Sequence, residues 1–582
     1  MRYLLIVPNV EEAMCPHQSE QLAACIGLRV VHHTPEFVLL ADGPADAIVA
    51  SDAGGIIVGN LFARHGPPEQ VRSLNDDDSR RASLTSGRHL VERFWGSYVA
   101  AFRSATGITV LRDPSGGLSC YYAQGKLGTA FASDFTLLVT AGVTVAAVDW
   151  DVVGRSLLLP HLPFEKTAIH GVAQLLAGCS LDVAAPLPAA RRVWSPWDHI
   201  DPWSGNEPAS DRLGRAVRSV HSAWASGFAR PLVGLSGGLD SSIVAACLAR
   251  ASPSISCVTL STSDPAGDER IYAREVACAF NANLIEAFHA VEAIDMDVSV
   301  AEGVPLPCGK LHEMAYNQAV REAVSLCEAD GFFVGAGGDN VFYLTHSARP
   351  VIDRYSKEGW SRGTLSTFKD VCALTGSSPW QVLDEAMRVY RARGKGMGWK
   401  ADPGLLHTDF LAAQKDQPVE HPWFDHPSDT PPGRIGHVTL LLRAMNHIEH
   451  RDKSLAVPMI SPLLSQPIVE MCLGIPSWEV CEGGVDRAVA RRAFASALPP
   501  KVAARQGKGT PEGFVANFIE QRRSEIAERL IDGELARKGI VDRVQLEGLF
   551  KREGDVGDAH RPRLMALLDT EAWVRRWGSV GS

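Results

Sequence analysis

The stretch that most constrains the fold of this chain is Ser236-Gly-Gly-Leu-Asp-Ser-Ser242. A short apolar run, Leu232 to Leu235, precedes it and predicts a buried strand, and good helix formers from Leu239 onwards predict a helix. A strand, a Gly/Ser turn and a helix N-terminus form an anion site, because the first N–H groups of a helix are unpaired and lie at the positive end of its dipole. Asp240, in the first helical turn, could hold a Mg²⁺ that bridges phosphate oxygens.

This loop lacks the Gly-Lys-Ser/Thr ending of the Walker pattern. Its seven positions resemble the pyrophosphate loop of ATP pyrophosphatases, the enzymes that cleave ATP between its α and β phosphates. A simpler alternative is a Gly/Ser turn between a core strand and a core helix. The resemblance implies an ATP site formed by this loop and by the ends of later strands: Leu235, Ser236, Gly237, Gly238, Asp240, Ser241, Ser242, Leu260 and Gly335.

Length and charge limit the classes of protein that the chain can belong to. With 582 residues it is too long for one hydrophobic core, so two or more domains are expected. Its hydrophobic fraction of 46% and charged fraction of 21% are those of an ordinary soluble globular protein. The net charge of −10 argues against nucleic acid as a partner and fits an enzyme of small molecules or peptides.

The 12 cysteines are scattered singly, without a Cys-x-x-Cys pair or zinc spacing. Cys247, Cys278 and Cys327 fall within apolar helical patterns, which predicts reduced core thiols. The apolar run at the N-terminus is too short for a signal peptide, and no run reaches the ~18 apolar residues of a membrane span. We therefore expect a cytoplasmic protein with no membrane partner.

Residues 1 to about 200 predict a β-rich domain of short strands separated by Gly, Pro and Asp turns. The expected strands are Tyr3–Val7, Phe37–Leu40, Gly55–Val58, Tyr98–Arg103, Thr109–Arg112 and Tyr121–Ala123. Helical signals are few and cover Val71–Asn75, Gly87–Arg93 and Trp150–Leu158.

The segment 195–211 has the composition of a linker, and Ser210 or Asp211 could cap an amphipathic helix that leads into the opening strand. Strands and helices then alternate: strands at Ile255–Ser261, Leu284–Phe288 and Gly331–Val334, helices at Glu269–Asn281 and Leu311–Ala329. Such alternation predicts a parallel, doubly wound sheet with its ligand at the carboxyl edge. From about 347 the chain is mostly helical, and 416–434 is either a loop or lid or a solvated connection.

A second carboxylate is expected at the same sheet edge. Adenylation of an acceptor by ATP needs magnesium to offset charge on the pyrophosphate and on the α-phosphate. Asp339 follows the strand at Gly331–Val334 in Gly335-Ala-Gly-Gly-Asp339, where it could hold the metal together with Asp240. The simpler alternative for this stretch is a Gly-rich surface turn.

Three motifs in the first part of the chain have a family resemblance. They are Phe94-Trp-Gly-Ser-Tyr-Val-Ala-Ala-Phe102, Leu111-Arg-Asp-Pro-Ser-Gly-Gly117 and Phe131-Ala-Ser-Asp134, with Tyr121-Tyr122 before the last. Their order resembles the class II glutamine amidotransferase domain, which implies an αββα sandwich over residues 1–205. That family uses an N-terminal cysteine as nucleophile, but residue 2 is Arg2 and the first cysteine is Cys15. We expect a degenerate domain without glutaminase activity.

Residues 206–582 resemble the synthetase domain of asparagine synthetases. The likeness rests on the two Gly-rich loops and on five further stretches: Asp268-Glu269, Arg451-Asp452, Ser461-Pro-Leu-Leu464, Arg487 with Arg491-Arg492-Ala493, and Leu498-Pro499. In that family a lysine stabilises the adenylate and the amide-forming transition state, a role that the resemblance implies for Lys508. A solvated basic loop is the alternative, because the spacing from Arg505 is one residue longer than usual. Lys508, Asp240 and Asp339 are thus the expected catalytic residues.

Two departures from this family select a branch of it. Arg2 removes the glutamine-derived ammonia, and Ala336 replaces both the glutamate of asparagine synthetases and the tyrosine of β-lactam synthetases. The chain therefore resembles the lasso peptide cyclases, which adenylate an Asp or Glu side chain of a precursor peptide. The peptide's own N-terminal amine then closes a macrolactam, a step favoured by tethering. The resemblance implies ATP, Mg²⁺, a precursor peptide, a leader peptidase and a leader-binding protein.

Two other interpretations remain open. The chain could be an amide synthetase of the asparagine or β-lactam type acting on a small carboxylate. A non-enzymatic nucleotide-binding scaffold is the third possibility, and the Asp240/Asp339 pair argues against it.

Overall fold

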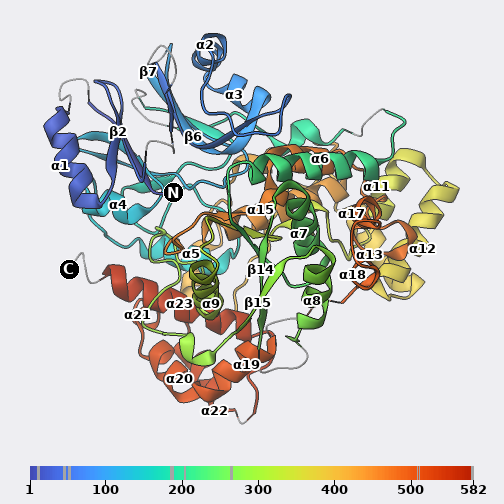
Figure 1. Cartoon of the computed structure of the whole chain (residues 1–582). Helices are drawn as coiled ribbons and strands as arrows, with labels where there is room; N and C mark the ends of the chain where they lie inside the picture. The colour runs from blue at the N-terminus through green and yellow to red at the C-terminus, as the bar shows by residue number, and fades with distance from the viewer. Residues whose placement is uncertain are drawn as a thin grey trace.

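The computed structural model describes residues 1–9, 14–43, 47–49, 54–105, 107–183, 189–201, 205–262, 267–507, 509, 512–552 and 554–578. Within these ranges the strands form three sheets, and the C-terminal half is largely helical (Figure 1). None of the helices in this part of the chain combines the length and the apolar character that crossing a bilayer requires.

Two antiparallel sheets of six strands each form the N-terminal sandwich. The first has the order β10 (Val172–Gln174), β8 (Tyr121–Gly125), β9 (Gly128–Ala132), β1 (Tyr3–Val7), β3 (Val38–Ala41) and β2 (Arg29–His33). The second has the order β12 (Arg191–Arg192), β11 (Cys179–Asp182), β7 (Gly107–Arg112), β6 (Phe94–Ser104), β5 (Gly55–Ala63) and β4 (Ala47–Val49). The six strands predicted in this part of the chain all correspond to observed strands.

The alternation of side chains along the strands shows that helices cover the outer face of each sheet. In β1, Leu5 belongs to the core between the sheets, whereas Leu4 packs with α1 (Pro16–Ile26) and α4 (Phe135–Thr140). In β6, Val99 faces the same inner core, whereas Phe102 packs with α2 (Asp76–Leu84) and α3 (Arg88–Arg93). Because successive residues of a strand point to opposite faces, the layers are helix, sheet, sheet and helix. This confirms the expected αββα fold.

One helix prediction in this region is wrong, and the helices α1 and α4 were not predicted. The helix expected at Val71–Asn75 is wrong, because Asn75 is the N-cap of α2 and its side chain accepts a hydrogen bond from Asp78 N. An N-cap residue lies outside the helix that it caps. The helix α1 was not predicted, although Pro16 begins it and Gly27 ends it in a left-handed conformation. The helices predicted at 87–93 and 150–158 correspond to α3 and to α5 (Trp150–Leu158).

The third sheet is parallel and doubly wound. Its order is β15 (Asn283–Phe288), β14 (Ser256–Ser261), β13 (Pro231–Gly234), β16 (Gly331–Val334) and β17 (Met459–Ile460). One face packs against α7 (Leu239–Ala251) and α8 (Arg270–Ala279), and the other against α9 (Glu313–Leu326). The strand order reverses between β13 and β16, and such a switch point opens a crevice at the carboxyl ends of the strands.

Helices make up most of the chain after β16, as expected. They are α10 (Gly338–Val341), α11 (Arg349–Glu358), α12 (Arg362–Thr375), α13 (Pro379–Arg391), α14 (Thr408–Gln414), α15 (Pro432–Glu449), α16 (Gln466–Leu473), α17 (Ala488–Phe494), α18 (Pro500–Ala504), α19 (Glu512–Gln521), α20 (Arg523–Ile531), α21 (Glu534–Arg537), α22 (Arg543–Lys551) and α23 (Arg561–Gly578). The connection 416–434 is not simply solvated, because Trp423 is buried and its carbonyl accepts a hydrogen bond from Trp197 Nε1 at 2.9 Å.

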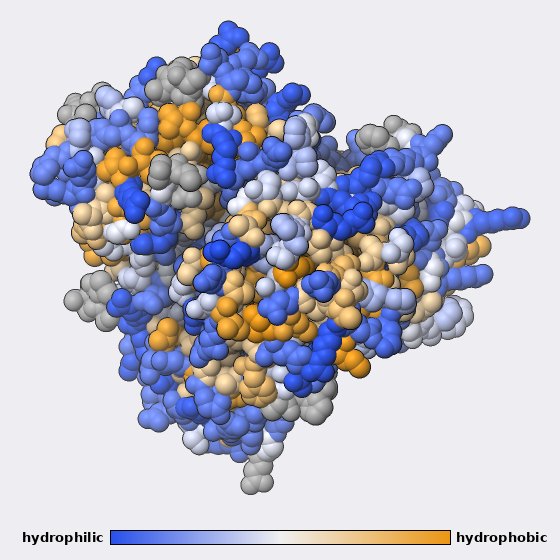
Figure 2. All heavy atoms as spheres, viewed as in Figure 1, coloured by the Kyte–Doolittle hydropathy of each residue, from blue (hydrophilic) through white to orange (hydrophobic). Residues whose placement is uncertain are grey.

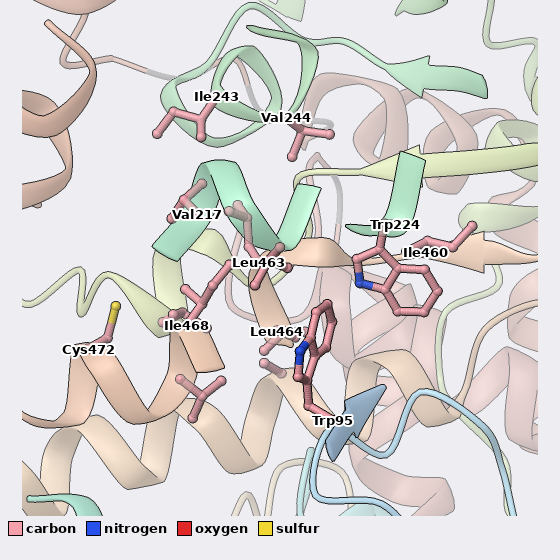
Figure 3. Packing of buried hydrophobic residues seen from close by; sticks show 14 of the residues in the cluster. Trp95, Val217, Trp224, Ile243, Val244, Ile460, Leu463, Leu464, Ile468 and Cys472 are labelled. Carbon is pink, nitrogen blue, oxygen red and sulfur yellow. The ribbon is translucent and has the colours of Figure 1, made fainter. Parts of the chain in front are cut away.

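The sandwich and the C-terminal part of the chain share one hydrophobic core. Trp224 of α6 (Ala209–Ala225) lies 6.3 Å from Trp95 of β6, measured between ring centroids (Figure 3). Its indole nitrogen donates to Ser465 Oγ at 3.0 Å. The boundary expected between residues 205 and 206 stays a prediction, since this core continues across it. In Figure 2 hydrophobic residues gather near the middle of the visible face, over the region of β14, β15 and α9.

Candidate nucleotide site

The loop Ser236–Ser242 lies between β13 and α7, with Gly238 as the N-cap of the helix. Gly237 has a φ of +67°, and a Cβ placed on it would lie 2.3 Å from Tyr272 Cβ of α8. Glycine alone tolerates both the left-handed conformation and this close approach. The hydroxyls of Ser236 and Ser241, 3.1 Å apart, link the two ends of the loop. The residues thus form the strand–turn–helix arrangement that the sequence predicts, and anion binding there stays a prediction.

The second Gly-rich loop, Gly335–Asn340, packs directly on the first. A Cβ on Gly335 would lie 2.6 Å from Ser241 N, and one on Gly338 would lie 2.3 Å from Asp240 Cγ. A larger residue at either position would push the loops apart. The two glycines therefore let Asp339 lie beside Asp240 at the switch point of the sheet.

Arg487 joins the two aspartates that were predicted as metal ligands. Its Nη1 donates to both carboxylate oxygens of Asp240, at 3.2 and 3.0 Å, and also to Asp339. Its Nη2 donates to Asp486 at 3.1 Å. Burial alone would lower the pKa of Arg487, but the three aspartates raise it, so the guanidinium is charged.

The donor set fits a magnesium ion bound together with phosphates. Mg²⁺ takes oxygen ligands and is usually held by one or two carboxylates plus substrate phosphates. Asp240 and Asp339 converge on a single cationic nitrogen of Arg487, so the pair is arranged to share positive charge. No group of three or more His, Cys, Asp or Glu side chains suited to a metal occurs among the residues that the structure describes. The remaining ligands would be nucleotide and water oxygens.

A cavity of about 560 Å³ opens beside the two loops. Of the residues predicted to bind ATP, those that line it are Leu235, Ser236, Gly238, Asp240, Ser241, Leu260 and Gly335. Gly237 and Ser242 do not line it: Gly237 lies against α8, and Ser242 is fully buried in the first turn of α7. Contact of these residues with ATP stays a prediction.

The segment that follows α18 closes one side of the cavity. Arg505 forms a partly buried ion pair with Glu269 at 2.6 Å, and its Nη1 donates to Ser236 O at 3.3 Å. The same Glu269 carboxylate accepts a hydrogen bond from Gly509 N at 2.9 Å. Lys508, the predicted catalytic lysine, lies outside the described residues, although Gly507 and Gly509 on either side of it line the cavity.

Several polar side chains in this cavity were not predicted as site residues. Arg487, Tyr316, His289 and His447 all line it. Ala336 lies among them, at the position where related synthetases were expected to carry a base. Asn340 is engaged elsewhere, because its Nδ2 donates to Leu440 O of α15 at 2.7 Å. Neither Ala336 nor Asn340 therefore offers a carboxylate or a phenol to this cavity.

The arginine of the sandwich motif, Arg112, is part of the contact between the sandwich and the C-terminal half of the chain. It is 1% exposed and forms a buried ion pair with Glu449 of α15, which also accepts a hydrogen bond from the Tyr121 hydroxyl. A cavity of about 770 Å³ lies nearby between the two halves, and Arg2 lines it. Among the described residues that line this cavity there is no cysteine, and Cys15 is exposed at the start of α1.

A doubly wound sheet that ends in a Gly/Ser loop beside paired carboxylates is the arrangement of an ATP-using enzyme. The family model described as Asparagine synthase matches residues 217–575, which is more than half of the chain. The chain belongs to the asparagine synthase family, whose members use ATP to form amide bonds.

Among solved structures, one similar chain is titled "Structure of the allosteric regulatory enzyme of purine biosynthesis". The two share 10% sequence identity with a TM-score of 0.22, over 57% of this chain and 89% of that one. The comparison with curated proteins found no match.

Proposed function

We propose that the chain is an ATP- and Mg²⁺-dependent macrolactam cyclase that acts on a ribosomal precursor peptide. The enzyme adenylates an Asp or Glu side chain of the peptide with release of pyrophosphate. The N-terminal amine of the same peptide then attacks the acyl carbon, and AMP leaves as the isopeptide bond forms.

The observation that carries this proposal is Ala336 in an otherwise intact nucleotide cavity. Ammonia or a small amine would need a proton acceptor from the enzyme, yet Ala336 has none and Asn340 donates to α15. An amine tethered to its own acyl group needs less help, because intramolecular attack has a high effective molarity. The absence of a cysteine among the described residues of the cavity between the halves supports an amine other than glutamine-derived ammonia.

The proposed roles of the chain's own residues are supported by the geometry, except for that of Lys508, which rests on the family resemblance. The first turn of α7 and the Ser236 and Ser241 hydroxyls bind the phosphates, as a helix N-terminus with Gly/Ser donors does. Asp240 and Asp339 hold the metal, which when bound offsets charge on the phosphates. Arg487 adds a fixed positive charge beside them. Lys508 is proposed to stabilise the adenylate and the amide-forming transition state.

The test is incubation of the purified protein with ATP, Mg²⁺ and the proteolysed precursor peptide. The expected product is lighter by one water, with one AMP formed for each ring closed. AMP release driven by aspartate and ammonia alone would instead identify a small-molecule amide synthetase. A leader peptidase, a leader-binding protein and a cytoplasmic location belong to the same proposal.

A further inference from the structure

A second cavity, of about 290 Å³, adjoins the nucleotide cavity. Its walls come from the sandwich half (156–164), the segment 306–313, the C-terminal part of α15 and the start of α23. The two cavities meet where Lys310, which lines the second, contacts His447, which lines the first. Parts of the chain that are far apart in the sequence thus build a chamber directly beside the ATP site.

His450 presents a hydrogen-bond acceptor in this second cavity. The side chain is 3% exposed, and its Nδ1 lies 2.7 Å from Asn446 O in the preceding turn. A carbonyl oxygen can only accept, so Nδ1 carries the proton and, in the neutral ring, Nε2 carries a lone pair. Burial lowers the pKa of His450 to about 4, which keeps the ring neutral at pH 7.

Nothing in the described part of the chain satisfies that acceptor. His450 Nε2 is buried and has no hydrogen-bond partner there, and the same holds for Nδ1 of His312 in the same cavity. His450 lines this cavity, and its Nδ1 is held by its own helix, which leaves Nε2 as the ring nitrogen available to a ligand. Buried polar atoms in native proteins are normally paired, so an unpaired acceptor beside a cavity indicates a ligand that donates.

The charges around the cavity favour an N–H donor over an anion. Lys310 lies 3.5 Å from Glu313, and Arg563 lies 3.8 Å from Asp402, so both cations face carboxylates. The ammonium group of Lys310 donates to His447 Nδ1, so the proton of the neutral His447 ring is on Nε2. The ring at the boundary of the nucleotide cavity is therefore a donor, suited to an acyl oxygen, whereas His450 is an acceptor, suited to an amine.

We infer that the second cavity receives the amine-bearing end of the substrate, whose N–H donates to His450 Nε2. The inference rests on the proposed function and assigns a place to the nucleophile. It also gives the sandwich half a role that needs no thiol, because residues 156–164 of that half form one wall.

The test compares His450→Phe, which removes the acceptor, with His450→Gln, which restores an acceptor oxygen. Two rates are measured: ATP–pyrophosphate exchange driven by the peptide, and ring closure. At saturating peptide, His450→Phe should leave the exchange rate unchanged and slow ring closure about tenfold, the usual range for a lost buried hydrogen bond. His450→Gln should recover most of the rate. Equal ring-closure rates in all three proteins would overturn the inference.

A matched control separates this effect from general damage to a buried histidine. His221 is fully buried, its Nδ1 contacts Val217 O at 2.7 Å, and its Nε2 has no partner among the described residues. It lines neither the nucleotide cavity nor the second cavity. His221→Phe should therefore leave ring closure at the wild-type rate, and the same loss in both variants would count against a specific role of His450.

A substrate analogue tests the same contact in the unaltered protein. In a des-amino peptide, hydrogen replaces the N-terminal amino group while the acceptor carboxylate remains. In the wild type, the des-amino peptide should need about tenfold more peptide than the parent for half-maximal exchange. In His450→Phe, the two peptides should need the same concentration, because the contact with the amine is already lost. Equal half-maximal concentrations in the wild type would contradict the inference. Absence of exchange with either peptide, together with exchange driven by aspartate, would instead refute the proposed function.

Discussion

Two arginines of this molecule, Arg112 and Arg487, lie beside carboxylates in very different surroundings. Arg112 lies between the two halves of the chain and donates to three backbone carbonyls, those of Leu118, Leu175 and Gly116, as well as to Glu449. Arg487 donates to three aspartates at the edge of a cavity of about 560 Å³. Arg112 is enclosed by protein partners, whereas Arg487 lines an open cavity.

The carboxylates differ in the same way. Burial would raise the pKa of Glu449, but Arg112, Lys453 and the Tyr121 hydroxyl lower it to about 2. Glu449 is thus one anion held by several donors, an arrangement that stabilises the fold. Asp240 and Asp339 are two anions that share one guanidinium nitrogen. Two carboxylates at close range repel each other, which favours binding of a further cation. The same repulsion lowers the stability of the protein when no such cation is bound.

Neutralising either aspartate of the nucleotide site should have the largest effect of all. Asp240→Asn and Asp339→Asn should each lower AMP formation by about a thousandfold, because the metal and the phosphates lose a charged ligand. Neither change should lower the urea midpoint of unfolding, since it relieves repulsion between the carboxylates. Near-normal AMP release in either variant would show that the metal ligands lie elsewhere, and a large drop in the midpoint would remove the contrast with Glu449.

The lysine predicted to act on the adenylate should give the next largest effect. Lys508→Ala should lower ring closure by about 10²–10³-fold, as the loss of an oxyanion-type donor does, again with little change in stability. Lys501→Ala is the control, because Lys501 is exposed in the nearby α18 and forms an ion pair with the partly exposed Glu275. Equal turnover in the two variants would assign the role to another basic residue.

The local parts of the site were predictable from the sequence. The Gly/Ser loop and the Gly335–Asp339 loop each lie within a few consecutive residues, and the alternation of strands and helices placed both at one sheet edge. The αββα sandwich followed from a resemblance carried by motifs such as Arg112-Asp113-Pro114. The missed helix α1 had signals, namely Pro16 at its first position and Gly27 at its end, but few apolar positions mark its inner face.

The contacts that complete the site were not predictable, because they join distant parts of the chain. Arg487 is 247 residues from Asp240, and Lys310 is 137 residues from His447. The sequence shows Arg487 only as one basic residue in a family-like stretch. Its left-handed backbone, with a φ of +48° at the N-cap of α17, depends on the surrounding fold and not on local preference.

Glu449, the buried carboxylate between the two halves, should affect stability and not activity, the opposite of Asp240 and Asp339. Glu449→Gln should lower the free energy of unfolding by about 3 kcal/mol at pH 7, because a buried Arg112 loses its counter-charge. AMP formation should match the wild type at temperatures where both proteins are folded. An unaltered urea midpoint together with lost activity would show that Glu449 acts in catalysis and not in stability.

The pH dependence of that difference has a definite sign. Glu449 has a folded-state pKa of about 2, below its ordinary value, so its stabilisation is fully present above about pH 4.5 and is lost as pH falls through 2. The gap in unfolding free energy between wild type and Glu449→Gln should therefore shrink by about half between pH 5 and pH 3. Urea titrations at several pH values measure it, and a gap that grows on acidification would contradict the ion pair.

The smallest effect expected is the loss of a single hydroxyl. Tyr121→Phe removes the hydrogen bond to Glu449 while Arg112 remains, and should cost about 1–2 kcal/mol of unfolding free energy. Tyr98→Phe is a matched control in the same sandwich, because Tyr98 is equally buried and its hydroxyl has no partner among the described residues. That change should be nearly neutral, since no hydrogen bond is lost and an unpaired polar atom is removed. If both phenylalanine variants cost the same, packing and not the charge on Glu449 holds the two halves of the chain together.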